Sequence, residues 1–372
     1  MFLVALPPVG RWVVVFNNAL FIGRTSTEPS TVFFSDLGDP EVWTTDNDYK
    51  FDGPIMGMGV LGNLVVVFKQ NSIGVLSGTN NEKLIKIDKY INGIGCSGGH
   101  SIFTAKIKGQ DVLIFHSDNG LWAFDGSRNL IDLSNCIRNK YQDGTTVNKW
   151  NTSRFQYAWG TYIPKYKWGM LALSDSGDAT NDFLLIIDLD RIQETRNGMY
   201  VPHWPMDAVP ANCLTCSKSV TTTRDDIYFG DTTGFIYRFD PSIFNRNGTA
   251  YNGYFRSKIL DNIKSWILIE ANLMADEGGE TVTIAAFADL DTASVSASVS
   301  LDDDADLLGT TFILGTSVLG GKDFVFKDAG LNTWGRFLQF RISNSTLNEG
   351  YRIESLNFIF QETGLEPNAK LE

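Results

Sequence analysis

A strand-like motif that recurs five times restricts the fold of this chain more than any other sequence feature. Its copies start at residues 18, 63, 111, 167 and 225, and each is a short apolar run such as Asn63-Leu64-Val65-Val66-Val67. Successive starts lie 45, 48, 56 and 58 positions apart. That spacing is typical of propeller blades, which consist of four short strands joined by loops of variable length. The pattern therefore predicts a series of small antiparallel sheets.

Turn-forming residues separate the apolar runs throughout residues 10–245. Asn-Asn, Gly-Asn and Gln-Asn pairs lie between runs of four to seven residues, as in β-hairpins. Helical periodicity is confined to residues 135–141 and 190–194. We predict an all-β chain with a β-propeller of about five to six short blades, and ring closure by the N-terminal strand is one option for the last blade. The alternatives are a β-sandwich and an irregular mixed sheet.

The pattern changes after residue 250. About seven strand-like segments follow, at residues 258–273, 281–289, 294–301, 311–315, 323–327, 335–343 and 351–361. Their number and spacing are typical of a β-sandwich. We therefore predict three parts: a β-propeller domain over residues 1–250, a β-sandwich domain over residues 251–362, and a polar C-terminal tail over residues 363–372.

Composition and charge argue against several functional classes. The chain has 31 basic and 43 acidic side chains, a net charge of −12 and a pI near 4.8. This balance disfavours a protein whose main task is to bind nucleic acid phosphates. Three histidines and four cysteines leave few ligands for a metal site or a nucleophilic dyad. We expect no catalytic residues, no metal site, no cofactor and no enzymatic activity.

The N-terminal residues 1–6 are apolar, but two prolines follow them and no basic residue precedes them. This pattern fits a first strand better than a signal peptide or a membrane span, and a longer natural chain is compatible with it. No other stretch is long and apolar enough for a membrane helix. The cysteine spacing matches no disulfide framework, so a reduced, soluble environment is the expectation.

Several short motifs have both a functional and a structural interpretation. They are the Cys-x-x-Cys of Cys213 and Cys216, the acidic run 302–306, the turn at 117–122 that resembles the Asp-box of sialidases, the glycine-rich stretch 93–99, and three Asn-x-Ser/Thr triplets at Asn151, Asn247 and Asn344. For each we favour the structural interpretation: free buried thiols, a solvated hairpin tip, an ordinary turn, a crossing between blades, and chance triplets. A zinc site would need four ligands, and glycoside hydrolysis would need two converging carboxylates.

Four tryptophans are candidates for stacking on sugars in a propeller that recognises host carbohydrate. They are Trp43, Trp122, Trp159 and Trp204. Packing in the core or between blades is the alternative that we favour for them.

Residues 17–73 carry a family resemblance. Asn17-Asn18-Ala19-Leu20-Phe21-Ile22-Gly23, followed by Thr31-Val32-Phe33-Phe34-Ser35-Asp36-Leu37-Gly38-Asp39-Pro40-Glu41-Val42-Trp43, resembles the propeller-bearing tail proteins of bacteriophages. The segment 59–73 is similar to the next blade of that family, and residues 258–361 are similar to the β-sandwich that often closes such chains.

The resemblance implies a structural virion protein of a phage tail, such as the nozzle or hub of a short-tailed phage. Such a protein forms a homo-oligomeric ring, typically a hexamer, that continues the DNA channel below the portal and adaptor proteins. Expected partners are therefore other copies of the chain, portal, adaptor and tail fibre proteins, and DNA that passes without specific binding. Assembly in the host cytoplasm and a final location in the virion are expected. The alternatives are a carbohydrate-binding receptor-recognition propeller and a glycosidase-like propeller enzyme.

Overall fold

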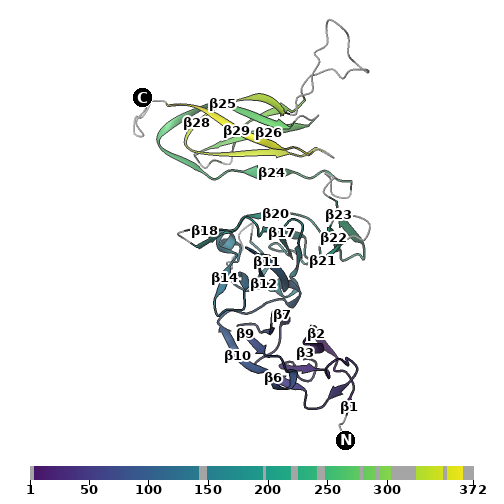
Figure 1. The fold of residues 1–372 in the computed structure, drawn as a ribbon. Helices are drawn as coiled ribbons and strands as arrows, with labels where there is room; N and C mark the ends of the chain where they lie inside the picture. Colours follow the sequence, from purple (N-terminus) through teal and green to yellow (C-terminus); the bar gives the residue numbers. More distant parts are fainter. Residues whose placement is uncertain are drawn as a thin grey trace. The chain divides into compact units, whose positions relative to one another are not determined.

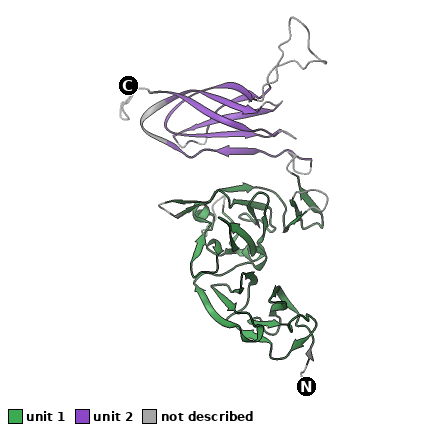
Figure 2. Ribbon diagram, in the orientation of Figure 1, with its two compact units in different colours: residues 1–240 green, residues 241–372 purple. Residues whose placement is uncertain are grey.

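The chain folds into two compact units, Met1–Asp240 and Pro241–Glu372 (Figure 2). The computed structural model describes residues 4–141, 149–195, 198–218, 225–240, 248–276, 280–289, 291, 293–302, 324–346 and 350–362. Regular structure in these residues is almost entirely β-strand, so the predicted all-β class is confirmed. The predicted domain boundary at residue 250 lies ten residues beyond the division between the units.

The first unit consists mainly of five antiparallel sheets that follow one another in chain order (Figure 1). We call these sheets blades 1 to 5. Blade 1 contains β2 (Gly10–Phe16), β3 (Ala19–Thr25), β4 (Thr31–Phe34) and β6 (Asp48–Lys50), and blade 2 contains β7 (Gly57–Leu61), β8 (Leu64–Phe68), β9 (Ser72–Ser77) and β10 (Ile85–Asn92). Blade 3 contains β11 (Phe103–Ile107), β12 (Gln110–Ser117), β13 (Gly120–Phe124) and β14 (Leu130–Asp132); blade 4 contains β15 (Trp159–Ile163), β16 (Trp168–Leu173), β17 (Phe183–Asp188) and β20 (His203–Met206); and blade 5 contains β21 (Cys213–Lys218), β22 (Asp225–Gly230) and β23 (Ile236–Phe239). The first strand of each blade contacts the first strand of the next, from β2 to β21. Four of these sheets have four strands, and the fifth has three in the described residues. This succession of small antiparallel sheets is that of a β-propeller, with five blades in the described residues.

Both faces of the middle blades are buried, which explains the continuous apolar runs in the sequence. Along β12, Val112 and Ile114 point into the core between blades 3 and 4, whereas Leu113 and Phe115 point into the core between blades 2 and 3. Successive side chains of a strand point to opposite faces, so a strand covered on both sides must be apolar at every position. Burial of each such side chain contributes about 1.5–3 kcal/mol.

The recurring motif marks the second strand of each blade: β3, β8, β12, β16 and β22. Two-residue turns lead into some of these strands, and in the first of them Asn17 and Asn18 have φ angles of 43° and 58°. Asparagine tolerates this left-handed conformation, which the tight hairpin turn requires. The hairpin prediction from Asn-Asn is therefore confirmed.

Two local predictions were wrong and one was right. The N-terminal strand β1 (Val4–Ala5) pairs with β5 (Trp43–Thr44), in the loop of blade 1, and not with the last blade. The end of the segment 190–194, predicted as helical, belongs to strand β18 (Gln193–Thr195), which pairs with β19 (Gly198–Tyr200) because cross-strand pairing overrides a weak local preference. The predicted helical segment 135–141 is the 3₁₀-helix η3 (Asn135–Tyr141).

The other helical segments are also short 3₁₀ turns: η1 (Asn81–Lys83), η2 (Gly99–Ser101) and η4 (Thr152–Tyr157). Within the described part of the chain, no helix has the length and apolar character needed to cross a membrane.

The second unit is built on one hydrogen-bonded sheet with two very long strands. Its strands are β24 (Gly253–Arg256), β25 (Leu260–Asp276), β26 (Thr281–Ala288), β27 (Val295–Ser300), β28 (Phe324–Asn344) and β29 (Ile353–Glu362). The first part of β28 pairs with β25, and its last part pairs with β24 and β26. The segments 323–327 and 335–343, predicted as two strands, thus belong to the single strand β28. The predicted strand 311–315 and tail 363–372 lie outside the described residues.

The two halves of this sheet share one core, which makes the unit a β-sandwich. Phe340 of β28 stacks on Phe358 of β29 with 3.6 Å between ring centroids, although the two strands are not hydrogen-bonded neighbours. Leu273 of β25 and Ile284 of β26 are buried in the same core. The predicted sandwich is therefore confirmed.

Candidate functional site

The residues that carry the family resemblance form a hydrogen-bonded loop in blade 1. In segment 35–43, the Asp36 carboxylate accepts a hydrogen bond from Thr44 Oγ1 at 3.0 Å. Trp43 is buried, and its indole N–H donates to the Pro40 carbonyl at 3.0 Å. Both hydrogen bonds stay within the segment that connects β4 to β6, so these side chains shape the loop.

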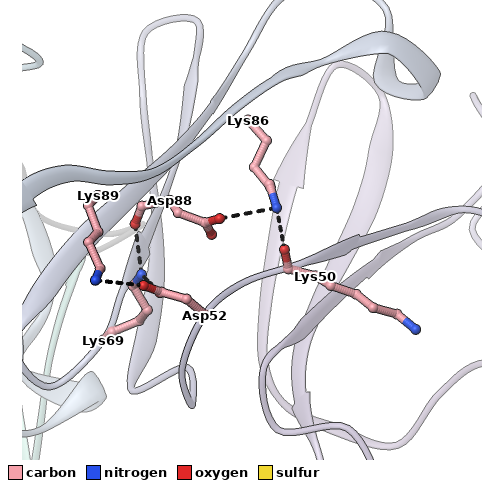
Figure 3. A network of polar contacts seen from close by, with 6 residues as sticks. All are labelled: Lys50, Asp52, Lys69, Lys86, Asp88 and Lys89. Atoms are coloured by element: carbon pink, nitrogen blue, oxygen red, sulfur yellow. Dashed lines mark hydrogen bonds and ion pairs between the residues drawn. The ribbon is translucent and has the colours of Figure 1, made fainter.

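A buried lysine joins blades 1 and 2 (Figure 3). The side chain of Lys69, only 4% exposed, donates a hydrogen bond to Asp52 Oδ1 and another to the Asp88 carbonyl at 2.7 Å. The Lys89 ammonium lies 3.2 Å from Oδ2, the other carboxylate oxygen of Asp52. Asp52 follows the last strand of blade 1, whereas the other three residues belong to blade 2. A buried ammonium needs such partners, and here they connect the two blades.

The same junction has a second connection, farther from the core. The Lys86 ammonium donates to the Lys50 carbonyl at 2.6 Å and lies 3.2 Å from Asp88 Oδ2. Hydrogen bonds from the Lys69 and Lys89 ammonium groups lower the pKa of Asp52. The carboxylate therefore stays ionised and bound, so the network is suited to holding blades together.

The glycine-rich stretch 93–99 is a crossing point of backbones, as predicted. A Cβ atom on Gly95 would lie 2.0 Å from the Lys69 carbonyl oxygen, and one on Gly99 would lie 2.2 Å from the Met56 carbonyl oxygen. Only glycine fits such approaches. The stretch is therefore a packing device between blades.

Aromatic rings link the inner strands of several blades. His100 lies parallel to Trp159 of blade 4, with centroids 4.0 Å apart, and at an angle to Trp12 of blade 1 at 4.9 Å. The Trp159 indole N–H donates to the Leu214 carbonyl of blade 5 at 2.8 Å. Burial and the nearby Arg11 lower the pKa of His100. The histidine therefore acts as a neutral ring between two indoles.

A second histidine lies in the core between blades 3 and 4. His116 is fully buried, contacts the rings of Tyr141 and Phe155, and has no hydrogen-bond partner for either ring nitrogen within the described structure. Burial lowers the pKa of His116 to about 3. The described structure places no acidic or nucleophilic partner on this imidazole, so its role there is to pack against the rings of Tyr141 and Phe155.

The four candidate tryptophans differ in exposure. Trp43 is buried, and Trp122 and Trp159 are half-buried. Trp204 is 37% exposed and meets the edge of the Trp168 ring at 5.4 Å. Among the four, Trp204 therefore has the most accessible ring.

Cys213 and Cys216 lie on opposite faces of β21, and Cys213 is exposed, contrary to the prediction of two buried thiols. Burial raises the pKa of Cys216 to about 11. In the part of the chain that the structure describes, no three His, Cys, Asp or Glu side chains converge on a possible metal position.

The Asp-box-like turn joins β12 to β13, and its Asp118 accepts a hydrogen bond from Ser97 Oγ at 2.6 Å. Of the acidic run 302–306, only Asp302 is among the described residues.

Two of the three Asn-x-Ser/Thr triplets are described, and Asn247 lies outside. The Asn151 amide donates to the Asp178 carbonyl at 2.9 Å. The buried Asn344 amide donates to the Thr281 carbonyl, also at 2.9 Å. Both side chains therefore have structural partners.

Sequence reasoning missed a pair of interacting carboxyl groups between β16 and β17. Burial, followed by a hydrogen bond with Asp178, raises the pKa of Asp182. The Asp182 carboxylate also accepts from the Asp175 amide at 3.5 Å. The only sequence signal was the density of aspartates in segment 175–182, which is common in loops of acidic chains.

Sequence reasoning also missed an uncovered apolar face on blade 1. Val13 and Val15 of β2 are 62% and 66% exposed, and the half-buried Leu20, Ile22 and Phe33 lie beside them on the same face. None of these five side chains belongs to a core of the described chain. The opposite face of blade 1 is packed on blade 2, so the blade is covered on one side only.

Comparisons with known proteins find likeness only at the level of fold. No family model matches the chain, and no curated protein matches it. The N-terminal domain of Nup159 is similar over 62% of this chain and 59% of that domain, with 9% identity and a TM-score of 0.30. The Bombyx mori GH32 β-fructofuranosidase BmSUC1 is similar over 92% of this chain and 93% of the enzyme, with 10% identity and a TM-score of 0.30. The exo-β-1,3-galactanase of Phanerochaete chrysosporium is similar over 93% and 80%, with 9% identity and a TM-score of 0.27.

These comparisons correct one expectation. The sequence led us to expect no enzymatic activity, but several similar solved structures are glycoside hydrolases. Glycosidases use carboxylates and need neither histidine nor cysteine, so a scarcity of these two residue types does not exclude hydrolysis. The inference from composition to absence of activity was therefore wrong. The TM-scores are too low to assign a hydrolase activity to this chain.

Proposed function

We propose that this chain is a structural protein of a bacteriophage tail, present as a ring of copies that continues the DNA channel. The observation that carries the proposal is the resemblance of residues 17–73 to phage tail propellers, which includes the loop segment 35–43. There the acidic and aromatic side chains, Asp36 and Trp43 among them, bond within the loop. The ties between blades through Lys69 and the glycine crossings add rigidity, which a tail component under pressure from passing DNA requires.

In this role, the chain contacts further copies of itself, portal and adaptor proteins above it, and tail fibre proteins around it. It assembles in the host cytoplasm and stays in the virion. A sixfold ring is the form that we propose.

The test is the composition and image of purified phage particles from the host that carries this gene. Mass spectrometry should detect the protein at several copies per particle, and electron microscopy at strand-tracing resolution should place it on the channel axis. Absence from intact particles, with the protein abundant in the infected cell, would contradict the proposal.

The proposed channel has an acidic inner wall. The net charge of −12 supports this, since lysine or arginine contacts would retain the DNA phosphates during ejection. We expect no binding of a 30-base-pair duplex in fluorescence anisotropy at about 0.15 M salt, a concentration at which basic patches still bind DNA with Kd values of about 10⁻⁴–10⁻⁶ M. A ring structure with a basic channel wall would exclude the idea.

A second candidate function is recognition of host carbohydrate, favoured by the aromatic group around Trp204. Tyr166 stacks on Trp168 with centroids 4.8 Å apart, Trp168 meets Trp204, and the Lys165 ammonium lies 4.9 Å from the Tyr166 ring centroid. The Trp204 ring is exposed, and an exposed ring can stack on a sugar. A glycan array should then give signals that Trp204→Ala abolishes and that the matched variant Trp122→Ala retains.

A further inference from the structure

Two arginines lie side by side on one face of the sheet in the second unit. Arg256 of β24 is paired with Arg341 of β28, directly across the two antiparallel strands. Their guanidinium groups lie 4.7 and 5.5 Å from the ring centroid of Phe287 in β26. Phe340 and Ile342, which flank Arg341 along β28, are buried in the sandwich core. The two arginines therefore share the face that points away from that core.

The positive charge of this pair is not neutralised within the described residues. Like charges directly opposite each other in a sheet are destabilising. Arg352 of the same unit has two carboxylate partners, whereas neither Arg256 nor Arg341 forms an ion pair with a described side chain. The Nε–H of Arg341 is also buried and without a hydrogen-bond partner in this part of the chain. The pair can therefore offer both charge and hydrogen-bond donors to an anion.

A small pocket of about 70 Å³ adjoins the pair, and Arg256 lines it. Two hydrogen-bond acceptors in its wall are held in position by other contacts. Asp291 accepts from the Ala293 amide through Oδ1 at 3.2 Å, which leaves Oδ2 for a ligand. Gln339 donates from Nε2 to the Ser257 carbonyl at 2.8 Å, which leaves Oε1. Both free oxygens can accept hydrogen bonds from hydroxyl groups.

The pocket wall also has accessible apolar side chains. Phe337 and Ile259 line it and are 37% and 43% exposed. An exposed ring such as that of Phe337 can lie against the C–H face of a sugar. The pocket is smaller than the about 300–1,000 Å³ typical of sites that enclose a drug-sized ligand, so it takes one end of a molecule and binds it weakly.

We propose that this pocket binds a sugar acid, free or as a unit of a polysaccharide. Its carboxylate binds the guanidinium groups of Arg256 and Arg341, whose planar geometry matches it. Its hydroxyl groups donate to the two fixed acceptors, and its ring lies against Phe337. A plain anion such as phosphate is disfavoured because the Asp291 carboxylate repels it, and a neutral sugar provides no counter-charge for the arginine pair. The site is separate from the aromatic group around Trp204 and does not rest on the proposed function.

Isothermal titration calorimetry of the full chain with galacturonate and galactose tests the proposal, since a carboxylate in the first replaces a hydroxymethyl group in the second. We expect a Kd of about 10⁻³ M for galacturonate and about tenfold weaker binding of galactose. Inorganic phosphate should also bind more weakly than galacturonate. Trigalacturonate distinguishes the sources: tighter binding than that of the single unit indicates a polysaccharide, and equal binding indicates a free sugar acid.

Variants assign the contacts. Arg341→Gln and Arg256→Gln should each weaken galacturonate binding about tenfold and leave galactose binding unchanged. Arg341→Lys should retain only part of the affinity, because an ammonium group lacks the planar fork. Asp291→Asn should weaken the binding of both sugars, since the hydroxyl groups lose a charged acceptor. Arg336→Gln is the matched control, because Arg336 is an exposed arginine of β28 that does not line the pocket, and it should bind galacturonate like the unchanged protein.

Circular dichroism should confirm that all variants are folded. The proposal is wrong if galacturonate does not bind at concentrations up to about 10⁻² M, or if galactose or phosphate binds as tightly as galacturonate. It is also wrong if R336Q weakens binding as much as R341Q. A D291N variant that binds galacturonate more tightly would contradict it too, since relief of repulsion would show a site for plain anions.

Discussion

At the scale of single residues, His116 makes the stability of the core between blades 3 and 4 depend on pH. It is neutral in the folded chain because burial lowers its pKa to about 3, whereas an unfolded histidine has a pKa of about 6.5. The unfolded state therefore binds a proton first as the pH falls. Stability contributed by the neutral ring is fully present above pH ~6.5 and is lost as the pH falls towards 3.

We predict that His116→Phe makes unfolding less sensitive to acid. Between pH 6 and pH 4, the free energy of unfolding of the unchanged chain should fall by about 1.4 kcal/mol per pH unit more than that of the variant. Phenylalanine preserves the ring contacts with Tyr141 and Phe155. Urea titrations at several pH values measure the difference, and parallel pH curves for both proteins would show that His116 is protonated in the fold.

Lys69 is the residue on which the junction of blades 1 and 2 depends. Lys69→Met removes an ammonium that bonds to Asp52 and to the Asp88 carbonyl, leaving both acceptors without it. We expect a loss of about 1–3 kcal/mol in the free energy of unfolding. Lys89→Met is the control, because Lys89 contacts the same carboxylate from an exposed position, where an ion pair contributes about 0–1 kcal/mol. Equal effects in chemical denaturation would contradict a special role for Lys69.

At the scale of elements, close backbone approaches determine which residues are tolerated. Gly95 touches the end of β8, where a Cβ atom would lie 2.0 Å from the Lys69 carbonyl oxygen. We predict that Gly95→Ala lowers the thermal midpoint of the first unit by several degrees, because the backbone must move apart. At Gly53 the nearest atom would be 3.8 Å from a new Cβ, so Gly53→Ala should leave the midpoint nearly unchanged. A neutral G95A variant would show that the crossing can relax.

Element type and order were largely predictable from the sequence, because alternation and turn residues are local signals. Segment 183–188 was predicted as a strand and is β17 with the same bounds. Pairing was less predictable: β1 joins blade 1, and β28 spans what looked like two strands. Strand partners depend on distant residues, which a local pattern does not contain. The Lys69 junction was missed for the same reason, since Asp52 is 17 residues away.

At the scale of the whole molecule, the sequence showed apolar strands but not which faces would be left uncovered. Val13 and Val112 have the same local pattern, yet one is exposed and the other is buried between blades. The difference comes from position in the series, because an end blade has one neighbour and an inner blade has two. Net charge follows from composition alone, whereas the distribution of charge over the surface depends on the fold.

The two units have separate cores, so each should respond to its own core substitutions. Ile284 is fully buried in the core of the second unit, and Ile114 is fully buried between blades 3 and 4 of the first. We predict that Ile284→Ala lowers only the calorimetric transition of residues 241–372, and that Ile114→Ala lowers only that of residues 1–240. Each should cost about 2–5 kcal/mol, through lost burial and the cavity left behind. Assignment of the transitions follows from the isolated segments 1–240 and 241–372, and a single transition shifted equally by both variants would mean that the units unfold as one.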